Sequence, residues 1–139
     1  MGVLIDTCIW IDVERGKLSP VDVGAYTKKE PVFISPITIA ELTYGTEQAK
    51  GNRDLYELRM ATLSRLRKKP SLAIDTTTGE IFGRLAAYLS QQKRGHHFRI
   101  QDLWLASQAI QQDMKILTYN EKDFSDIPGL NLILVKHSH

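Results

Sequence analysis

The chain has 139 residues, of which 42% are hydrophobic and 24% are charged, as in an ordinary soluble globular protein with one sizeable core. Its formal charge of +2 permits a nucleic-acid partner without requiring one. No apolar run approaches the roughly 20 residues that cross a bilayer, and no basic segment precedes the short apolar start, which argues against a membrane protein and a secretory signal. The single cysteine excludes an intrachain disulfide and agrees with a cytoplasmic location.

Short apolar segments alternate with helical patterns along the chain. We predict strands at 2–6, 31–35, 72–75, 114–118 and 130–135. We predict helices at 8–15, after Ser19, at 36–48, 52–68, 77–93 and 102–113, with a loop at 95–101 and a turn or helical turn at 120–124. This alternation predicts βαβ units, and hence an α/β fold in which a small central parallel sheet is surrounded by helices. Since no repeat or linker interrupts the pattern, we interpret 1–139 as one domain.

Acidic and amide side chains follow the predicted strands. Asp6 ends the first strand, Glu41 lies in the second turn of helix 36–48, and Asp102 begins helix 102–113. Asn120 and Asp123 follow strand 114–118. Because ligands of open α/β sheets bind beyond the carboxyl ends of the strands, we expect these side chains to meet at one edge.

Carboxylates that gather in one place raise one another's pKa values, and at neutral pH they need a compensating cation. Carboxylate and amide oxygens are ligands that suit Mg²⁺ or Mn²⁺ rather than zinc. The pattern therefore predicts a divalent-metal site that acts on phosphate esters.

Each of these residues also has a purely structural interpretation. Asp6 and Asp102 could be N-caps or first-turn residues of the helices that they precede, and Asn120 and Asp123 could be turn formers. Glu41 is the hardest to explain in this way, because it interrupts an apolar stretch with no obvious partner nearby.

The segments LIDTCIWID, ISPITIAELTYG, DLWLASQA and LTYNEKDFSDIPGL, in this order and at these separations, resemble a PIN-domain ribonuclease. More narrowly, they resemble the VapC toxins of bacterial and archaeal toxin–antitoxin pairs. The resemblance implies a PIN-like fold and a metal-dependent endoribonuclease that uses Mg²⁺ or Mn²⁺. It implies the catalytic set Asp6, Glu41, Asp102 and Asn120, of which Asp6 and Asp102 hold the metal, with Thr7, Thr118 and Asp123 as further pocket residues. The chain departs from the family at two positions, with Cys8 where many members have Asn and Asn120 where many have Asp.

Two kinds of partner follow from this interpretation. An acidic pocket repels RNA, so basic residues must bind the RNA backbone beside it. The candidates are Arg84, Lys93, Arg94, His96, His97 and Arg99, and the alternative is a solvated polar loop. By resemblance, a VapB-like antitoxin would lie in the groove of the helical hairpin 36–68, and the chain would form a homodimer.

Two other classes of protein compete with the nuclease interpretation. One is a PIN-fold binding module with weak or no catalytic activity. The acidic set argues against it, because uncompensated carboxylates destabilise the fold. The other is a phosphoryl-accepting receiver domain, which needs adjacent acids after the first strand and a lysine after the last. Here Thr7 and Cys8 follow Asp6, and Lys136 lies near the end of the chain.

Overall fold

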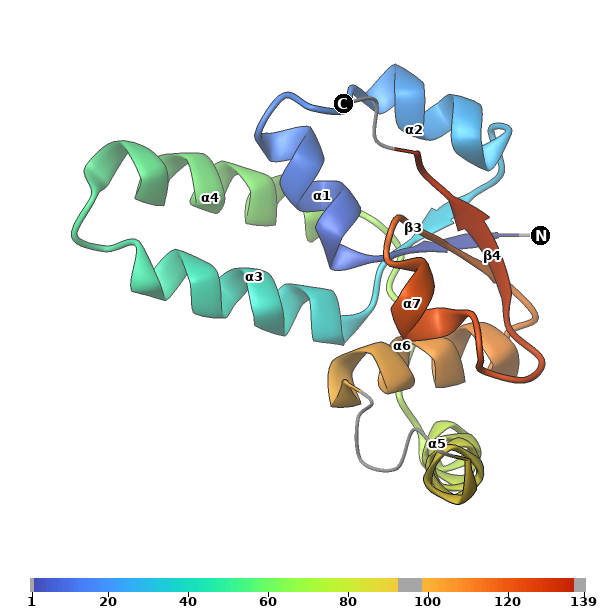
Figure 1. Cartoon of the computed structure of the whole chain (residues 1–139). Helices are drawn as coiled ribbons and strands as arrows, with labels where there is room; N and C mark the ends of the chain where they lie inside the picture. The colour runs from blue at the N-terminus through green and yellow to red at the C-terminus, as the bar shows by residue number, and fades with distance from the viewer. Residues whose placement is uncertain (1, 93–98, 137–139) are drawn as a thin grey trace.

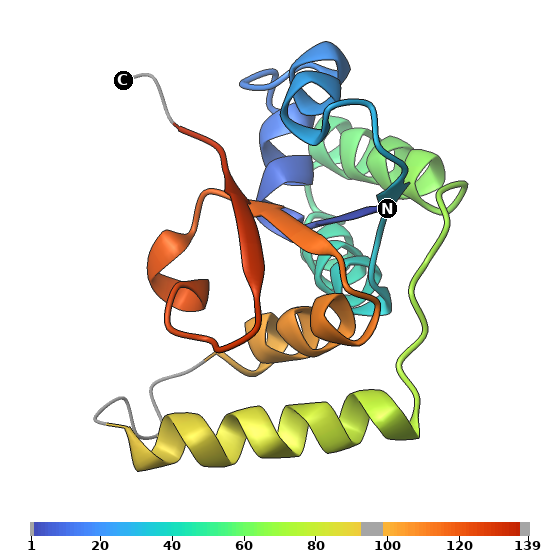
Figure 2. The same ribbon diagram turned by 90° about the vertical axis from the view of Figure 1, so that its right-hand side faces the viewer.

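The computed structural model describes residues 2–92 and 99–136. Within them, four parallel strands form one sheet in the order β2-β1-β3-β4 (Figures 1 and 2). The strands are β1 (Val3–Ile5), β2 (Val32–Phe33), β3 (Lys115–Thr118) and β4 (Asn131–Leu134). The helices are α1 (Thr7–Glu14), α2 (Pro20–Thr27), α3 (Pro36–Gln48), α4 (Arg53–Leu66), α5 (Thr76–Gln91), α6 (Ile100–Gln111) and α7 (Glu121–Phe124). The predicted α/β fold, a small parallel sheet surrounded by helices, is confirmed.

Helices cover both faces of the sheet. Leu4 and Ile116 point to one face, where they pack against buried side chains of α5, α6 and α7. Val3, Ile5 and Leu117 point to the other face and pack against α1, α2 and α4. Successive residues of a strand face opposite sides, so strands covered on both sides are apolar at every position. This is why β1 reads as an unbroken apolar run, with all three residues buried.

Helices α3 and α4 form an antiparallel hairpin that extends to one side of the sheet (Figure 1). Its bounds agree with the predicted helices 36–48 and 52–68. At its start the Ser35 hydroxyl accepts a hydrogen bond from the backbone N–H of Ile37, and Pro36 occupies the first helical position. These two residues fix the point at which the chain leaves β2 and enters α3.

The predicted strand 72–75 is wrong. Ser71 forms only an isolated bridge to Ile34, and the chain then turns away into α5. Asp75 begins that helix, since its carboxylate accepts from the backbone N–H of Thr78 and the Thr78 hydroxyl accepts from the backbone N–H of Asp75. The buried Gln108 of α6 donates to the carbonyl oxygens of Leu72 and Ala73. A side chain thus supplies the hydrogen bonds that a fifth strand would need.

One other boundary differs from the sequence-based expectation. Helix α6 begins at Ile100, inside the predicted loop 95–101, so Asp102 lies in its first turn rather than at its cap. The short helix α7 confirms the helical alternative for the segment 120–124. Among the described residues, no helix has both the length and the apolar character required to span a bilayer.

The role of Gln108 can be tested directly. Gln108→Leu should lower the free energy of unfolding by about 2 kcal/mol or more, because the carbonyl of Leu72 and the buried Ser35 hydroxyl lose their partner. Urea denaturation measures the change. Gln112→Leu, at an exposed position after the same helix, is the control. Equal losses in the two variants would contradict this role.

Candidate active site

The candidate site lies where β1 and β3 end, at the same edge of the sheet. Asp6 follows β1, and its buried carboxylate accepts a hydrogen bond at Oδ2 from the hydroxyl of Thr118, the last residue of β3 (2.8 Å). Asp6 occupies the N-cap position of α1, but its side chain makes no capping hydrogen bond. Asp6 is therefore the N-cap residue that the structural interpretation expected, but its carboxylate does not cap the helix and is turned to Thr118 instead.

A second carboxylate comes from α3. Glu41 is half-buried, and Thr7 Oγ1 donates to its Oε1 at 2.9 Å. Thr7 Oγ1 also lies 3.0 Å from the hydroxyl of Thr38, one turn before Glu41 on α3. Thr7 follows Asp6 directly, so this short polar chain links the end of β1 to α3. Thr38 was not predicted, although its position three residues before Glu41 on one helix face is a signal that could have found it.

The third carboxylate is Asp102, which is buried in the first turn of α6. Among the described residues, no group donates a hydrogen bond to its Oδ2. The Arg99 guanidinium lies nearby without satisfying it, with Nε 3.5 Å from Asp102 Oδ2 and Nη2 3.8 Å from Glu41 Oε2. Arg99 therefore compensates part of the negative charge by proximity. Buried polar atoms are nearly always hydrogen-bonded, so this oxygen marks a place where a further group can bind.

Burial is the main cause of perturbed acidity in all three carboxylates. It raises the pKa of Asp6, of Glu41 and of Asp102. Burial together with the charge of Asp6 raises the pKa of Asp102 to about 7, although Arg99 acts in the opposite direction. The charges of Asp123 and Glu41 make smaller contributions in the same direction as that of Asp6. Four carboxylates on different elements thus act on one another electrostatically.

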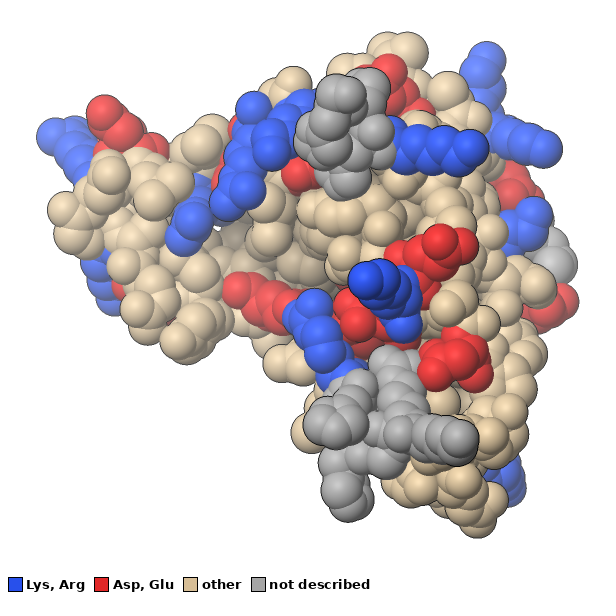
Figure 3. Space-filling model, viewed as in Figure 1, with Lys and Arg blue, Asp and Glu red and all other residues tan. Residues whose placement is uncertain are grey.

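The residues after β3 lie beside this group. The backbone N–H of Asn120 donates to Thr118 Oγ1, the same hydroxyl that holds Asp6. Asn120 and Asp123 both line an open cleft at the start of α7. Figure 3 shows acidic side chains gathered around α7 and the start of α3, with basic side chains among them.

Cys8 has a role that sequence analysis missed. Its Sγ donates to Asp6 Oδ2 at 3.3 Å, so the thiol and the Thr118 hydroxyl hold the same oxygen. Burial, with the charge of Asp6, raises the pKa of Cys8 to about 12, which keeps the thiol protonated at neutral pH. Cys8 therefore orients Asp6, and its position two residues after a strand-ending Asp, at the start of a helix, is the signal that could have suggested this.

The predicted RNA-binding residues are not gathered in one described patch. Arg84 lies on α5, where its guanidinium is exposed and pairs with Glu80 at 3.5 Å. Arg99 faces Glu41 and Asp102. Lys93, Arg94, His96 and His97 lie outside the described residues.

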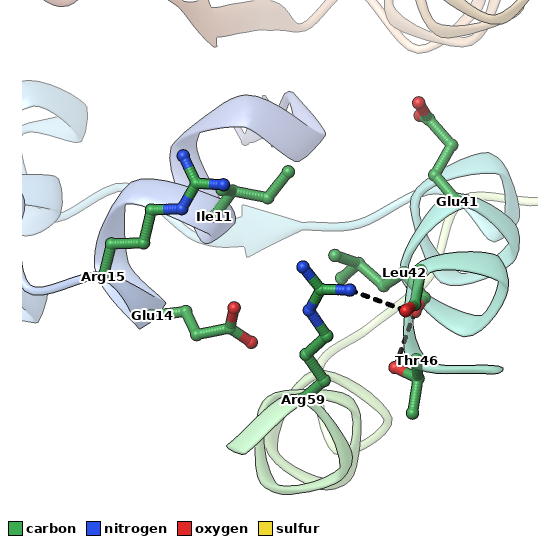
Figure 4. Close-up of a pocket in the computed structure, with 8 residues that line it drawn as sticks. Ile11, Glu14, Arg15, Glu41, Leu42, Thr46 and Arg59 are labelled. Carbon is green, nitrogen blue, oxygen red and sulfur yellow. Dashed lines mark hydrogen bonds between the residues drawn. The ribbon is translucent and has the colours of Figure 1, made fainter. Parts of the chain in front are cut away.

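A narrow cleft adjoins the acidic group between α1, α3 and α4 (Figure 4). Its lining residues are Ile11, Glu14, Arg15, Glu41, Leu42, Gly45, Thr46 and Arg59. Arg59 reaches across from α4 and donates to the carbonyl oxygen of Gly45 at 2.6 Å. Glu41 belongs to this cleft and to the acidic group, so the cleft leads from the hairpin to the candidate site.

The carboxylate oxygens are the type of ligand that a hard cation such as Mg²⁺ prefers, but they are not close enough together to surround an ion. Within residues 2–92 and 99–136, no three His, Cys, Asp or Glu side chains are close enough together to surround a metal ion. The oxygen ligands and the unpartnered Oδ2 of Asp102 nevertheless match the preference of Mg²⁺, which binds few protein carboxylates and keeps several waters.

Comparison with known proteins gives the family. The model of the PIN domain matches residues 3–130. The chain belongs to the PIN domain family. It is 31% identical to the protein named Ribonuclease VapC of Rickettsia bellii (strain RML369-C), with 97% of each chain covered. The resemblance read from the sequence is thereby confirmed.

Solved structures of VapBC proteins contain chains with the same fold. The structure of VapBC2 from Rickettsia felis bound to a DNA fragment from their promoter contains a chain with a TM-score of 0.82 and 25% identity. The match covers 98% of this chain and 100% of that chain. VapBC-5 from Mycobacterium tuberculosis, a member of the VapBC family of toxin–antitoxin systems, gives a TM-score of 0.77 at 25% identity, with 96% and 98% covered.

The raised pKa of Asp102 predicts how the stability of the fold depends on pH. Between about pH 4 and pH 7, folded Asp102 holds a proton that the unfolded chain has lost, so the stability of the metal-free protein should fall as the pH rises. Asp102→Asn should flatten this dependence and raise Tm at pH 7.5, by roughly 4 °C for each kcal/mol of relieved destabilisation.

Thermal unfolding in EDTA between pH 5 and pH 8 measures both effects. Asp113→Asn, an exposed site after the end of α6, is the control and should follow the wild type. A wild-type chain that becomes more stable from pH 5 to pH 7.5 would contradict the account of Asp102.

Proposed function

We propose that this chain is an endoribonuclease that requires Mg²⁺ or Mn²⁺ and acts as the toxin of a toxin–antitoxin pair. The observation that carries the proposal is the gathering of Asp6, Glu41 and Asp102, from three different elements, around an oxygen that lacks a donor. The similarity to proteins named Ribonuclease VapC supports RNA as the substrate class. We also propose that the chain is one domain and acts in the cytoplasm.

In this proposal Asp6 and Asp102 hold the cation. Thr118 and Cys8 both donate to Asp6 Oδ2, so two side chains orient the carboxylate that would hold the cation. Asp102 offers the unpartnered Oδ2. When bound, the cation supplies positive charge next to the phosphate and lowers the pKa of a water molecule.

Glu41 is the proposed general base. Its half-buried carboxylate has a raised pKa, mainly because of burial, and Thr7 holds its Oε1. It would accept a proton from the water that attacks phosphorus. The bond from phosphorus to the 3′ oxygen would break, and the departing 3′ oxygen would keep the bonding electron pair and take up a proton from water. The products would be a 5′-phosphate and a 3′-hydroxyl. Asn120 and Asp123 would complete the pocket next to Thr118.

In this proposal Arg99 contacts the carboxylates of the site when no cation is bound and an RNA phosphate when one is bound. Without a cation it lies within 4 Å of Glu41 and Asp102. A bound cation would replace that compensation, and the exposed guanidinium would then contact an RNA phosphate. The predicted contributions of Arg84, Lys93, Arg94, His96 and His97 to RNA binding stay predictions.

The cleft between α1, α3 and α4 is the proposed site of a VapB-like antitoxin. It lies between α1 and the predicted 36–68 hairpin, and Glu41 is one of its lining residues (Figure 4). Arg15 and Arg59 would pair with acidic side chains of the antitoxin, whereas Glu14 and Glu41 would attract a basic one. Solved VapBC complexes of relatives support a partner of this kind. We also propose that the chain forms a homodimer.

Removal of single carboxylates tests the nuclease directly. Asp6→Asn, Glu41→Gln and Asp102→Asn should each reduce cleavage of RNA by about 100-fold or more, because each removes a charge that stabilises the reacting phosphate or water. Glu80→Gln, on the exposed face of α5, should leave cleavage unchanged. EDTA should abolish the activity, and Mg²⁺ or Mn²⁺ should restore it.

Cleavage that persists in EDTA would contradict the proposed cation. A wild-type protein that cleaves no RNA with either metal, yet keeps its antitoxin, would favour the alternative of an inactive PIN-fold binding module.

Co-expression tests the partner. The chain should co-purify with the small protein encoded beside it, and Arg15→Glu with Arg59→Glu should reduce the retained partner by about 10-fold or more through charge repulsion. Arg53→Glu, an exposed charge at the start of α4 outside the cleft, is the matched control. A partner retained equally by the cleft variant and the control would contradict this binding site.

A further inference from the structure

The contacts that hold Arg99 beside the carboxylates of the candidate site are weak. Its nitrogens lie 3.5 Å from Asp102 Oδ2 and 3.8 Å from Glu41 Oε2, longer than the roughly 2.8 Å of a charge-assisted hydrogen bond. Its side chain is 52% exposed, so water competes with both partners. Arg99 is also the N-cap residue of α6, where the helix dipole favours negative rather than positive charge. The guanidinium can therefore leave this place at little cost.

The place of the Arg99 guanidinium overlaps the place proposed for the divalent cation. Asp102 Oδ2 faces Nε of Arg99 and is also the oxygen that the proposed function offers to the cation. A cation on this oxygen would stand next to the guanidinium, and like charges at short range repel. Among the described residues, no other Lys or Arg side chain lies within 4 Å of Asp6, Glu41 or Asp102. Arg99 and the cation thus bind to the same negative charge.

We propose that Arg99 competes with the divalent cation, and that this competition couples cation binding to RNA binding. In the metal-free chain the guanidinium is paired with Glu41 and Asp102 and adds nothing to RNA affinity. A bound cation releases it, and its fork of donors then pairs with a phosphate of the RNA backbone. The inference rests on the proposed function and adds a regulation of its site, because each ligand tightens the binding of the other by the same factor.

The competing interpretation gives Arg99 a supporting role toward the cation. Burial raises the pKa of Asp6, Glu41 and Asp102, and the charge of Arg99 lowers all three by a smaller amount. On this interpretation Arg99 assists cation binding by keeping the carboxyl groups ionised. A divalent cation that binds these groups carries twice the charge and ionises them itself, so the assistance is small beside the repulsion. The two roles predict opposite changes in cation affinity when Arg99 is removed.

Cation affinity without RNA is the first measurement. Mn²⁺ binding is followed by electron paramagnetic resonance of the free ion at pH 8, above the pKa of about 7 of Asp102, so that protons compete little. Arg99→Ala should bind Mn²⁺ about fivefold more tightly than the wild type, near the upper limit for a partly exposed ion pair. Arg99→Lys keeps a positive charge and should stay within about twofold of the wild type. The matched control is Arg53→Ala, which removes an arginine paired with Glu57 at 3.2 Å on α4 and should leave Mn²⁺ affinity unchanged.

RNA affinity with and without Mn²⁺ is the second measurement. A labelled single-stranded oligoribonucleotide is mixed with each variant, and its fluorescence anisotropy is recorded by stopped flow before cleavage proceeds. Without Mn²⁺, Arg99→Ala and the wild type should bind RNA equally, because the guanidinium is paired with carboxylates. With saturating Mn²⁺, Arg99→Ala should bind RNA about fivefold more weakly. This loss should equal the gain in Mn²⁺ affinity, because one ion pair is broken by the cation and re-formed with the phosphate.

Two results would overturn the inference. One is Mn²⁺ binding by Arg99→Ala that equals or is weaker than that of the wild type, since a weaker affinity assigns Arg99 the supporting role. The other is an RNA affinity that falls equally with and without Mn²⁺, which would make Arg99 a permanent phosphate contact. RNA cleavage alongside either result would leave the proposed function intact. Tighter Mn²⁺ binding and Mn²⁺-dependent loss of RNA affinity in Arg99→Ala, with no RNA cleavage by the wild type, would support the inference and contradict the nuclease. A wild-type chain that binds no Mn²⁺ would overturn both.

Discussion

Carboxylates that repel one another gather at one edge of the sheet, and this constraint governs the chemistry of the candidate site. Asp6, Glu41 and Asp102 are removed from water to different degrees, and burial raises the pKa of each. Arg99 lies within 4 Å of two of them but leaves Asp102 Oδ2 without a hydrogen bond. Such an arrangement costs stability in the isolated chain. A divalent cation, together with the phosphate that it attracts, would relieve that cost, so the strain and the proposed chemistry share one origin.

The hydrophobic layers hold this edge in place. β1 and β3 are adjacent parallel strands buried on both faces, and their ends bring Asp6 to within 2.8 Å of the Thr118 hydroxyl. Helices α3 and α6 then present Glu41 and Asp102 from the same side. The side chains that orient the acids, such as Cys8 and Thr7, come from the first residues of α1. A rigid core thus positions polar groups that would otherwise repel one another.

Much of the fold and the acidic group could be predicted, because strand ends and helix starts are local signals. The bounds of α3 follow from the Ser35-Pro36 cap, and the places of Asp6 and Asp102 follow from the apolar segments beside them. The prediction of a strand at 72–75 was wrong because Gln108, which is distant in sequence, donates to the backbone carbonyls that a neighbouring strand would otherwise bind. The contact of Arg99 with Glu41 was missed for the same reason, because it joins elements that chain order alone does not bring together. The contact of Cys8 with Asp6 is local and was missed because a thiol is only a weak donor.

The most direct test of the central claim is the position of a bound cation. Crystals grown with Mn²⁺ and measured for its anomalous scattering should show one strong peak within about 2.5 Å of carboxylate oxygens of Asp6 and Asp102, the distance range of oxygen-bound divalent ions. The Arg99 guanidinium should move away from Asp102 in the same crystals. A peak on other residues, or full Mn²⁺ saturation in solution by a chain that lacks both the Asp6 and the Asp102 carboxylate, would contradict the account.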